Sequence, residues 1–270
     1  LVHAGAALES LGRFNEQIQM AEQALALQTP DGDPELKHYI RYVLGCGYIY
    51  RGDLEIGNRI IDESTSAGSG EDERMEVAQK TIHKAVSLIF AGNYREALKE
   101  LEFAFSIYHE LGKPLGDENF SRYQATFLGL GDYQKALELA NQFTTTYGQS
   151  VMFAGQAYLM LGQNDLAQAI LEKTIQAGQQ TLNLRGIGLN KAYLSIAYFQ
   201  NGEAQRAAEL LSEVLLTCKP DSSLDLSSAL LAIAFFLHEQ GDIEQALETY
   251  TAALKNPFLG KSDWTHDYLG

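Results

Sequence analysis

Residues 194–202 read LSIAYFQNG, and this stretch decides the fold because its spacing recurs along the chain. The bulky residue Tyr198 lies four positions before Gly202, and the small residue Ser195 lies seven before it. A glycine with an apolar segment before it and an amphipathic segment after it occurs at Gly12, Gly52, Gly92, Gly131, Gly162, Gly202 and Gly241. The successive gaps of 40, 40, 39, 31, 40 and 39 residues indicate an internal repeat.

Positions counted from each repeated glycine hold similar residues in every copy. Position −4 is bulky throughout: Leu8, Tyr48, Leu88, Phe127, Tyr158, Tyr198 and Leu237. Position +5 is small in six of the seven copies: Gln17, Gly57, Ala97, Ala136, Ala167, Ala207 and Ala246. Small residues let two helices approach closely, and bulky residues at three- and four-residue spacing form a buried stripe. The columns therefore predict a helix on each side of every glycine.

Each glycine is expected to make the tight turn between two antiparallel helices. Short polar residues directly after it are expected to cap the second helix: Asp53, Asn93, Asp132 and Asp242. We therefore predict an all-α solenoid of about seven antiparallel helix pairs, forming a single array over residues 1–270. The approximate ranges of the pairs are 1–28, 36–67, 74–112, 117–147, 149–178, 184–218 and 223–256, and residues 257–270, with Trp264, are expected to begin a capping segment.

This pattern resembles the tetratricopeptide repeat. The resemblance is clearest in residues 194–202 and in GDIEQAL at residues 241–247, and it covers essentially the whole chain. It implies a right-handed superhelix in which the first helix of each pair lines a concave surface. One departure is the period, which is near 40 residues and not the usual 34. The 31-residue gap between Gly131 and Gly162 predicts one tight junction, near Tyr147.

Two further stretches resemble the repeat arrays of large bacterial signalling proteins, namely STAND-type ATPases and related transcriptional activators. Residues 108–116, YHELGKPLG, are similar to the connection between helix pairs in those arrays, and residues 256–264, NPFLGKSDW, are similar to the end of the array. In that family the repeats sense a ligand or partner and control an upstream nucleotide-binding module. The chain begins at Leu1 without a methionine, so we expect it to be a piece of a longer protein.

The composition disfavours several classes of partner. The formal net charge of −15 repels phosphate backbones and anionic lipid heads, so neither nucleic acid nor membrane is expected as a partner. Acidic charge on a helical array is typical of a solvated outer face. The two cysteines, Cys46 and Cys218, lie far apart, and the sequence shows no leader peptide and no membrane-spanning run. These features predict a cytoplasmic protein.

The residue types that catalysis or cofactor binding requires do not occur at the necessary spacing. No Gly-rich phosphate loop ends in Lys-Ser or Lys-Thr, and the six histidines never form a pair with metal-ligand spacing. Neither cysteine has the sequence context of a nucleophile. We therefore expect no enzyme activity, no cofactor and no metal site.

The resemblance implies where a ligand would bind. In tetratricopeptide arrays, positions −3, −6, −10 and often −2 face the groove, and neighbouring positions join them. The candidate ligand- or peptide-binding residues are Tyr39, Tyr42, Ile49, Tyr50, Ile82, Ile89, Phe90, Arg122, Leu128, Met152, Leu159, Met160, Tyr193, Phe199 and Phe235. Two interpretations stay open, because these residues could be packed between the first helices or could form an exposed apolar groove. A clamp for a terminal carboxylate is disfavoured, because Arg122 is the only strong cation in the set.

Two functional hypotheses follow. The first is a non-catalytic scaffold for protein interaction or ligand sensing, acting as the regulatory sensor arm of a multidomain bacterial signalling protein, with an intramolecular ATPase domain as one partner. The second is a free-standing adaptor that binds an apolar peptide or helix of partner proteins, because aromatic residues and methionines suit such docking. A nucleotide- or DNA-binding domain encoded before Leu1 would distinguish the first from the second.

Overall fold

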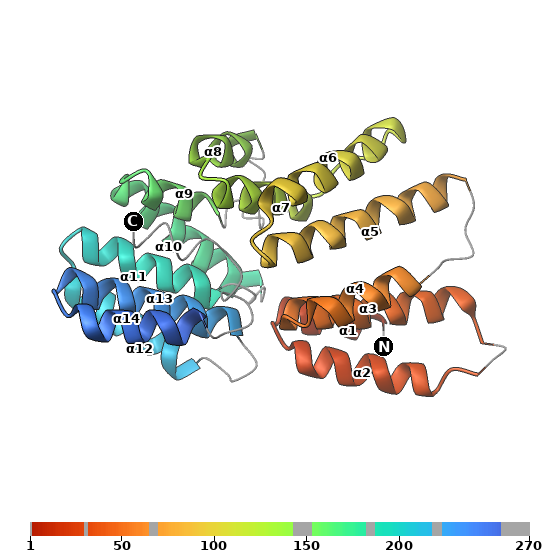
Figure 1. The fold of residues 1–270 in the computed structure, drawn as a ribbon, viewed down its shortest axis with the longest axis horizontal. Coiled ribbons are helices and arrows are strands. Elements are labelled where there is room, and N and C mark those ends of the chain that lie inside the picture. Colours follow the sequence, from red (N-terminus) through yellow and green to blue (C-terminus); the bar gives the residue numbers. More distant parts are fainter. Residues whose placement is uncertain are drawn as a thin grey trace. The chain divides into compact units, whose positions relative to one another are not determined.

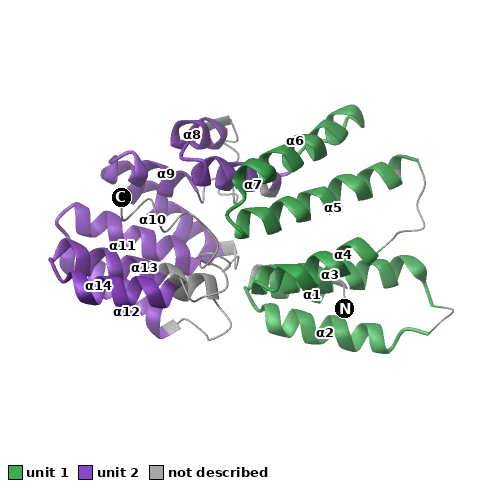
Figure 2. Cartoon of the chain, viewed as in Figure 1, with its two compact units in different colours: residues 1–115 green, residues 116–270 purple. Residues whose placement is uncertain are grey.

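The computed structural model describes residues 2–29, 32–64, 70–142, 153–181, 187–217 and 223–254, in which all regular structure is helical (Figure 1). Two compact units divide the chain, residues 1–115 and residues 116–270 (Figure 2). The predicted all-α solenoid of paired helices is confirmed, because fourteen helices lie in the described part of the chain and, within each unit, consecutive ones pack together. None of these helices is long and apolar enough to cross a membrane.

The first unit contains three helix pairs. Their first helices carry odd numbers and their second helices even numbers. The bounds are α1 (Val2–Ser10), α2 (Phe14–Ala26), α3 (Pro34–Arg51), α4 (Leu54–Glu63), α5 (Glu71–Phe90) and α6 (Tyr94–Glu110).

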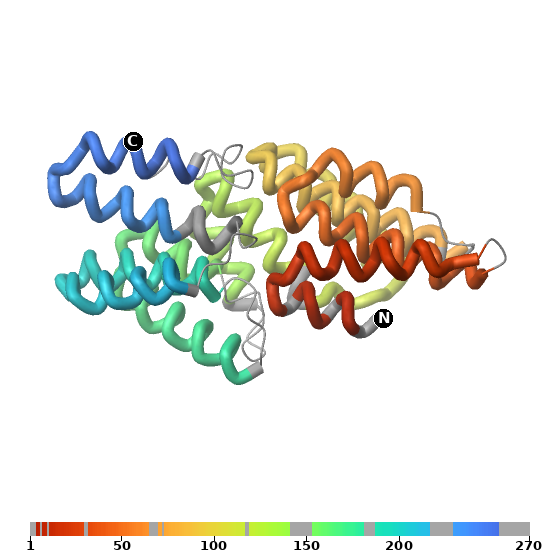
Figure 3. Tube along the Cα trace, turned by 90° about the horizontal axis from the view of Figure 1, so that it is seen from below, coloured from red at the N-terminus to blue at the C-terminus, as the bar shows by residue number. Residues whose placement is uncertain are grey.

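The second unit contains four pairs. The bounds are α7 (Asp117–Gly129), α8 (Tyr133–Gln142), α9 (Ala154–Met160), α10 (Asn164–Thr181), α11 (Ile187–Gln200), α12 (Ala204–Thr217), α13 (Ser223–Glu239) and α14 (Ile243–Leu254). The tube in Figure 3 shows one such pair, α13 and α14, as two neighbouring blue rods joined by a short turn. The expected junction near Tyr147, the residues 257–270 and Cys218 lie outside the described residues.

The repeated glycines make the turns between paired helices. All seven have positive φ, from 67° at Gly12 to 99° at Gly52, a region that side chains with a Cβ rarely adopt. At Gly52 the turn is closed by two backbone bonds, from the Gly52 N–H to Ile49 (3.0 Å) and from the Asp53 N–H to Tyr48 (2.9 Å). The repeat register therefore marks the end of each first helix.

Only part of the predicted capping occurs. Asp132 accepts a bond from the Lys135 N–H (3.0 Å), and Asp242 accepts one from the Gln245 N–H (3.3 Å). Asp53 and Asn93 make no capping bond, which corrects the expectation for these two. The Asp53 carboxylate is engaged by Arg51 at 2.5 Å, so an ion pair replaces the cap.

Position +5 is the point of closest approach within each pair. Ala97, Ala136, Ala167 and Ala207 have no exposed surface there. At Gly57 a Cβ would lie 2.7 Å from the Gly45 oxygen, so the two backbones are in contact. The small column thus sets the distance between the paired helices, as the pattern predicted.

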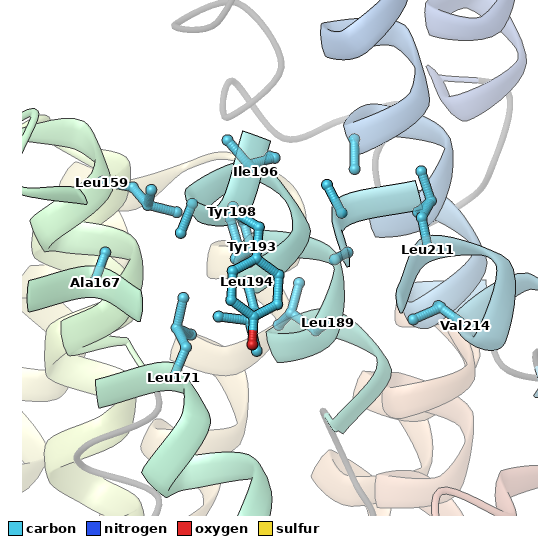
Figure 4. Packing of buried hydrophobic residues seen from close by; sticks show 14 of the residues in the cluster. Leu159, Ala167, Leu171, Leu189, Tyr193, Leu194, Ile196, Tyr198, Leu211 and Val214 are labelled. Atoms are coloured by element: carbon cyan, nitrogen blue, oxygen red, sulfur yellow. The ribbon is translucent and has the colours of Figure 1, made fainter. Parts of the chain in front are cut away.

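Adjacent pairs stack mainly through the second helix of one and the first helix of the next, except that α13 packs chiefly on the first helix α11. In the first unit, Phe14 of α2 stacks on Tyr50 of α3 with ring centroids 5.6 Å apart. One repeat later, Ser87 of α5 donates to Asn58 of α4 at 2.8 Å. In the second unit the buried residues of α11 lie between those of α10 and α12 (Figure 4). The core is therefore a series of similar interfaces.

Candidate functional site

Two of the first helices of the second unit, α9 and α11, carry almost no charge. The α9 sequence, AGQAYLM, has no charged residue, and α11 has only Lys191. The Lys191 side chain is 10% exposed and is paired with Glu213 of α12. A helix that is apolar on all sides is normally covered on all sides. These helices therefore offer a ligand apolar and neutral polar groups, and no carboxylate or phosphate clamp.

The structure buries about half of the sequence-predicted site residues. Below 9% exposure, and so packed between helices, are Ile49, Tyr50, Ile82, Ile89, Leu128, Leu159 and Tyr193. Partly exposed are Tyr39, Tyr42, Phe90, Arg122, Met160, Phe199 and Phe235. Met152 lies outside the described residues. That any of these residues contacts a ligand remains a proposal. A ligand could reach the partly exposed residues without separating the packed helices.

In the first unit the candidate residues gather where α3 meets α5. The Tyr42 hydroxyl contacts the His83 Nε2, and the two rings meet edge to face with centroids 4.8 Å apart. The Cys46 Sγ lies 3.7 Å from the Nδ1 of His83. Nearby, Tyr50 and Phe90 also meet edge to face at 6.3 Å. Because Cys46 is at position −6 and His83 at position −9, these positions lie in the seam between consecutive first helices.

In the second unit three phenylalanines form a cluster between α11 and α13. The ring of Phe199 stacks on that of Phe236 at 4.7 Å and meets Phe235 edge to face at 6.2 Å. All three side chains are partly exposed. Sequence reasoning singled out Phe199 and Phe235 but missed Phe236. Its position, −5, is occupied in the first unit by Gly47 and Ser87, which face the preceding pair. Three partly exposed rings make this the most aromatic surface among the described candidates.

Arg122, the one strong cation in the candidate set, is engaged by its own helix. Its Nη1 donates to the Asn119 Oδ1 at 2.9 Å. Asn119 is itself buried, so this bond holds the guanidinium against α7. That the chain has no clamp for a terminal carboxylate stays a prediction.

One carboxylate network joins α10, α11 and α12. The Tyr198 hydroxyl donates to Glu172 of α10 at 2.8 Å, and the Arg206 guanidinium lies 4.2 Å above the Tyr198 ring. Burial, and then the bond to Glu172, raises the pKa of Tyr198 to about 12. These groups bind one another and tie neighbouring pairs together, so the network has a structural role.

Sequence reasoning also missed a set of buried carboxamides. Gln156 of α9 is 2% exposed, and neither its Nε2 nor its Oε1 has a hydrogen-bond partner; the Oδ1 of Asn190 on α11 is likewise buried and unpartnered. A signal for Gln156 was present, because the other copies have Ala6, Cys46, Val86, Ala125, Ile196 and Phe235 at position −6. A single amide in an apolar column calls for a specific explanation.

The described residues hold no group of three or more His, Cys, Asp or Glu side chains that could bind a metal ion. Cys46 and His83 lie 3.7 Å apart, and the next neighbour of His83 is the phenol of Tyr42, which is not a side chain of this kind.

Comparison with solved structures identifies a protein of the same architecture. No family model matches the chain, and no curated protein matches its sequence. The chain is similar in structure to NprR. The match, to NprR solved in complex with its cognate peptide NprX, has a TM-score of 0.61 and covers 98% of this chain and 80% of that one. The sequence identity of 12% means that the likeness shows the fold, a tetratricopeptide-like array of helix pairs.

Proposed function

We propose that the chain is a non-catalytic scaffold that binds a peptide, and that the first helices of its second unit carry the binding surface. The cluster of Phe199, Phe235 and Phe236 is the observation that carries this proposal. Its rings are partly exposed on α11, whose one charged residue is Lys191, and in the apolar middle of α13, whose Asp225 and Glu239 stand near its ends. Partly exposed rings suit the apolar side chains of a ligand. NprR, a protein of similar fold, has been solved with a peptide bound, which supports the same class of ligand.

The test uses peptides selected from a phage-displayed random heptapeptide library on the wild-type chain. Phe199→Ala is expected to raise the Kd of a selected peptide at least tenfold, about 1.4 kcal/mol, because truncating a buried aromatic contact removes a binding hot spot. Fluorescence anisotropy with a labelled peptide measures the change.

Phe103→Ala is the matched control, since Phe103 on α6 is 53% exposed and lies outside the cluster. Its Kd is expected to equal that of the wild type. An unchanged Kd in Phe199→Ala, in a variant that unfolds at the wild-type urea concentration, would place the binding surface elsewhere.

We further propose that the array is the sensor arm of a larger signalling protein and reports peptide occupancy to a nucleotide-binding module. The support is the resemblance of residues 108–116 and 256–264 to arrays of that kind. The test is the full reading frame: a nucleotide-binding domain encoded before Leu1 is expected. A complete frame that starts near Leu1 would exclude the sensor arm and favour the adaptor.

A further inference from the structure

Gln156 is the most poorly satisfied polar side chain among the described residues of the second unit. Both amide atoms are buried and neither has a partner. Two other buried glutamines differ from it in this respect. Gln17 donates to the Val43 oxygen at 3.1 Å, and Gln124 donates to the Ala136 oxygen at 3.2 Å, so each ties two helices together. Gln156 makes no such tie, and its presence lowers the stability of the ligand-free fold.

The position of Gln156 places it at the edge of the candidate surface. In the first unit the side chain at position −6, Cys46, contacts the next first helix, so this column lies in the seam between first helices. The corresponding seam in the second unit is formed by α9 and α11, which contact each other. One turn after Gln156, Met160 is partly exposed, so the seam reaches the surface there. To contact a ligand at that surface, the buried Gln156 side chain would have to rotate outward past Met160.

The neighbouring helix offers a second unsatisfied amide. The Oδ1 of Asn190 on α11 is buried without a partner, and Asn190 is 3% exposed. Apart from the paired Lys191, α9 and α11 have no charged side chain. The polar chemistry of this surface is thus that of neutral carboxamides, which donate and accept hydrogen bonds like a peptide bond.

We propose that Gln156 binds the main chain of an extended peptide, its Nε2–H donating to a ligand carbonyl and its Oε1 accepting a ligand N–H, while the Oδ1 of Asn190 accepts a second N–H. This rests on the proposed function and narrows its ligand. An extended segment has free main-chain donors and acceptors, whereas a helix has used its own internally. The ligand is therefore an extended peptide with apolar side chains, and not an amphipathic helix.

The first arm of the test measures stability without any ligand. Gln156→Met keeps the length of the side chain and removes the unpartnered amide, so its urea unfolding midpoint is expected to rise above that of the wild type. Gln124→Met is the matched control, and its midpoint is expected to fall because the bond to Ala136 is lost. A fall in Gln156→Met as well would show that Gln156 has a structural partner and would overturn the proposal.

The second arm uses a heptapeptide selected on the wild-type chain, together with versions of it that are N-methylated at one peptide bond at a time. Gln156→Met is expected to weaken binding about tenfold despite its greater stability. N-methylation at the recognised bond is expected to weaken binding to the wild type by a similar factor and to leave binding to Gln156→Met unchanged. Gln124→Met is expected to bind like the wild type, because Gln124 faces α8.

The outcomes separate this proposal from the proposed function. A peptide that binds equally to the wild type and to Gln156→Met overturns the role of Gln156 and leaves peptide binding intact. Selection that yields only helical ligands insensitive to N-methylation overturns the extended-peptide assignment. Failure to select any peptide overturns the proposed function, and this proposal with it.

Discussion

At the scale of single residues, one hydrogen bond recurs between neighbouring pairs. Tyr48 donates to Glu22 at 3.0 Å, and Tyr198 donates to Glu172 at 2.8 Å. In both cases the tyrosine is at position −4 and the glutamate at position +10 of the preceding repeat. An arginine covers each ring, Arg51 at 4.8 Å and Arg206 at 4.2 Å. At these two positions of the −4 column, the tyrosine therefore ties neighbouring pairs together in addition to contributing bulk.

The buried tyrosines predict a loss of stability at alkaline pH. Burial raises the pKa of Tyr250 to about 12, and that of Tyr198 rises to a similar value. An unfolded tyrosine titrates near pH 10. The folded chain favours the neutral form of these tyrosines. Their contribution to the free energy of unfolding is therefore complete below about pH 10, and it is lost as the pH rises from 10 towards 12. Urea unfolding at pH 8, 10 and 11 should show the wild-type midpoint falling steeply over this range.

Tyr250→Phe removes one of these groups and provides the comparison. Its midpoint is expected to fall less than that of the wild type between pH 8 and pH 11, whatever its value at pH 8. Parallel profiles for the two proteins would mean that Tyr250 ionises in the folded chain as it does in the unfolded one.

At the scale of helices, the small column at position +5 makes a sharp prediction. Ala207 on α12 has no exposed surface, whereas its neighbour Ala208 is exposed. Ala207→Asp places an unpaired carboxylate between two helices, and a loss of about 3–5 kcal/mol in the free energy of unfolding is expected. Ala208→Asp introduces the same residue type into the same helix at an exposed position, and the free energy of unfolding is expected to fall by about 0.5–1 kcal/mol. Denaturant titration measures both, and equal losses would mean that the repeat register is shifted.

The helices also show how much of the fold and of the candidate site the sequence could predict. Glycine spacing identified the turns and the contact column, since both are local consequences of residue size and backbone freedom. The caps at Asp53 and Asn93 were wrong, and for Asp53 the reason is a competing partner, Arg51, that helix periodicity does not reveal. The pattern also showed which face of each first helix is apolar. It could not show that the seam is closed over Ile49 and open at Phe199, because that depends on the distance between helices.

At the scale of the whole molecule, the repeated interfaces predict that stability is a nearest-neighbour property. Within each unit a pair packs on its neighbours in the sequence, so a defect should weaken its own pair and its immediate neighbours first. Two glycines allow such defects to be placed far apart in the sequence. Gly57→Ala brings a Cβ to 2.7 Å from the Gly45 oxygen on α3, and Gly155→Ala forces a Cβ into the Leu171 side chain on α10. Each overpacked contact is expected to reduce stability by about 1–3 kcal/mol.

Amide hydrogen exchange resolves where that loss is felt. In Gly57→Ala, faster exchange is expected in α3 and α4 and then in the pairs beside them, while α11 to α14 keep wild-type protection. In Gly155→Ala, faster exchange is expected in α9 and α10 and then in α7, α8, α11 and α12, while α13 and α14 are unchanged. Gly116→Ala, where φ is −81° and a Cβ meets nothing within 4 Å, should leave every helix unchanged. Uniform acceleration in all helices of either variant would mean that the array unfolds as one cooperative body, and a ligand bound to one pair would then stabilise every pair equally.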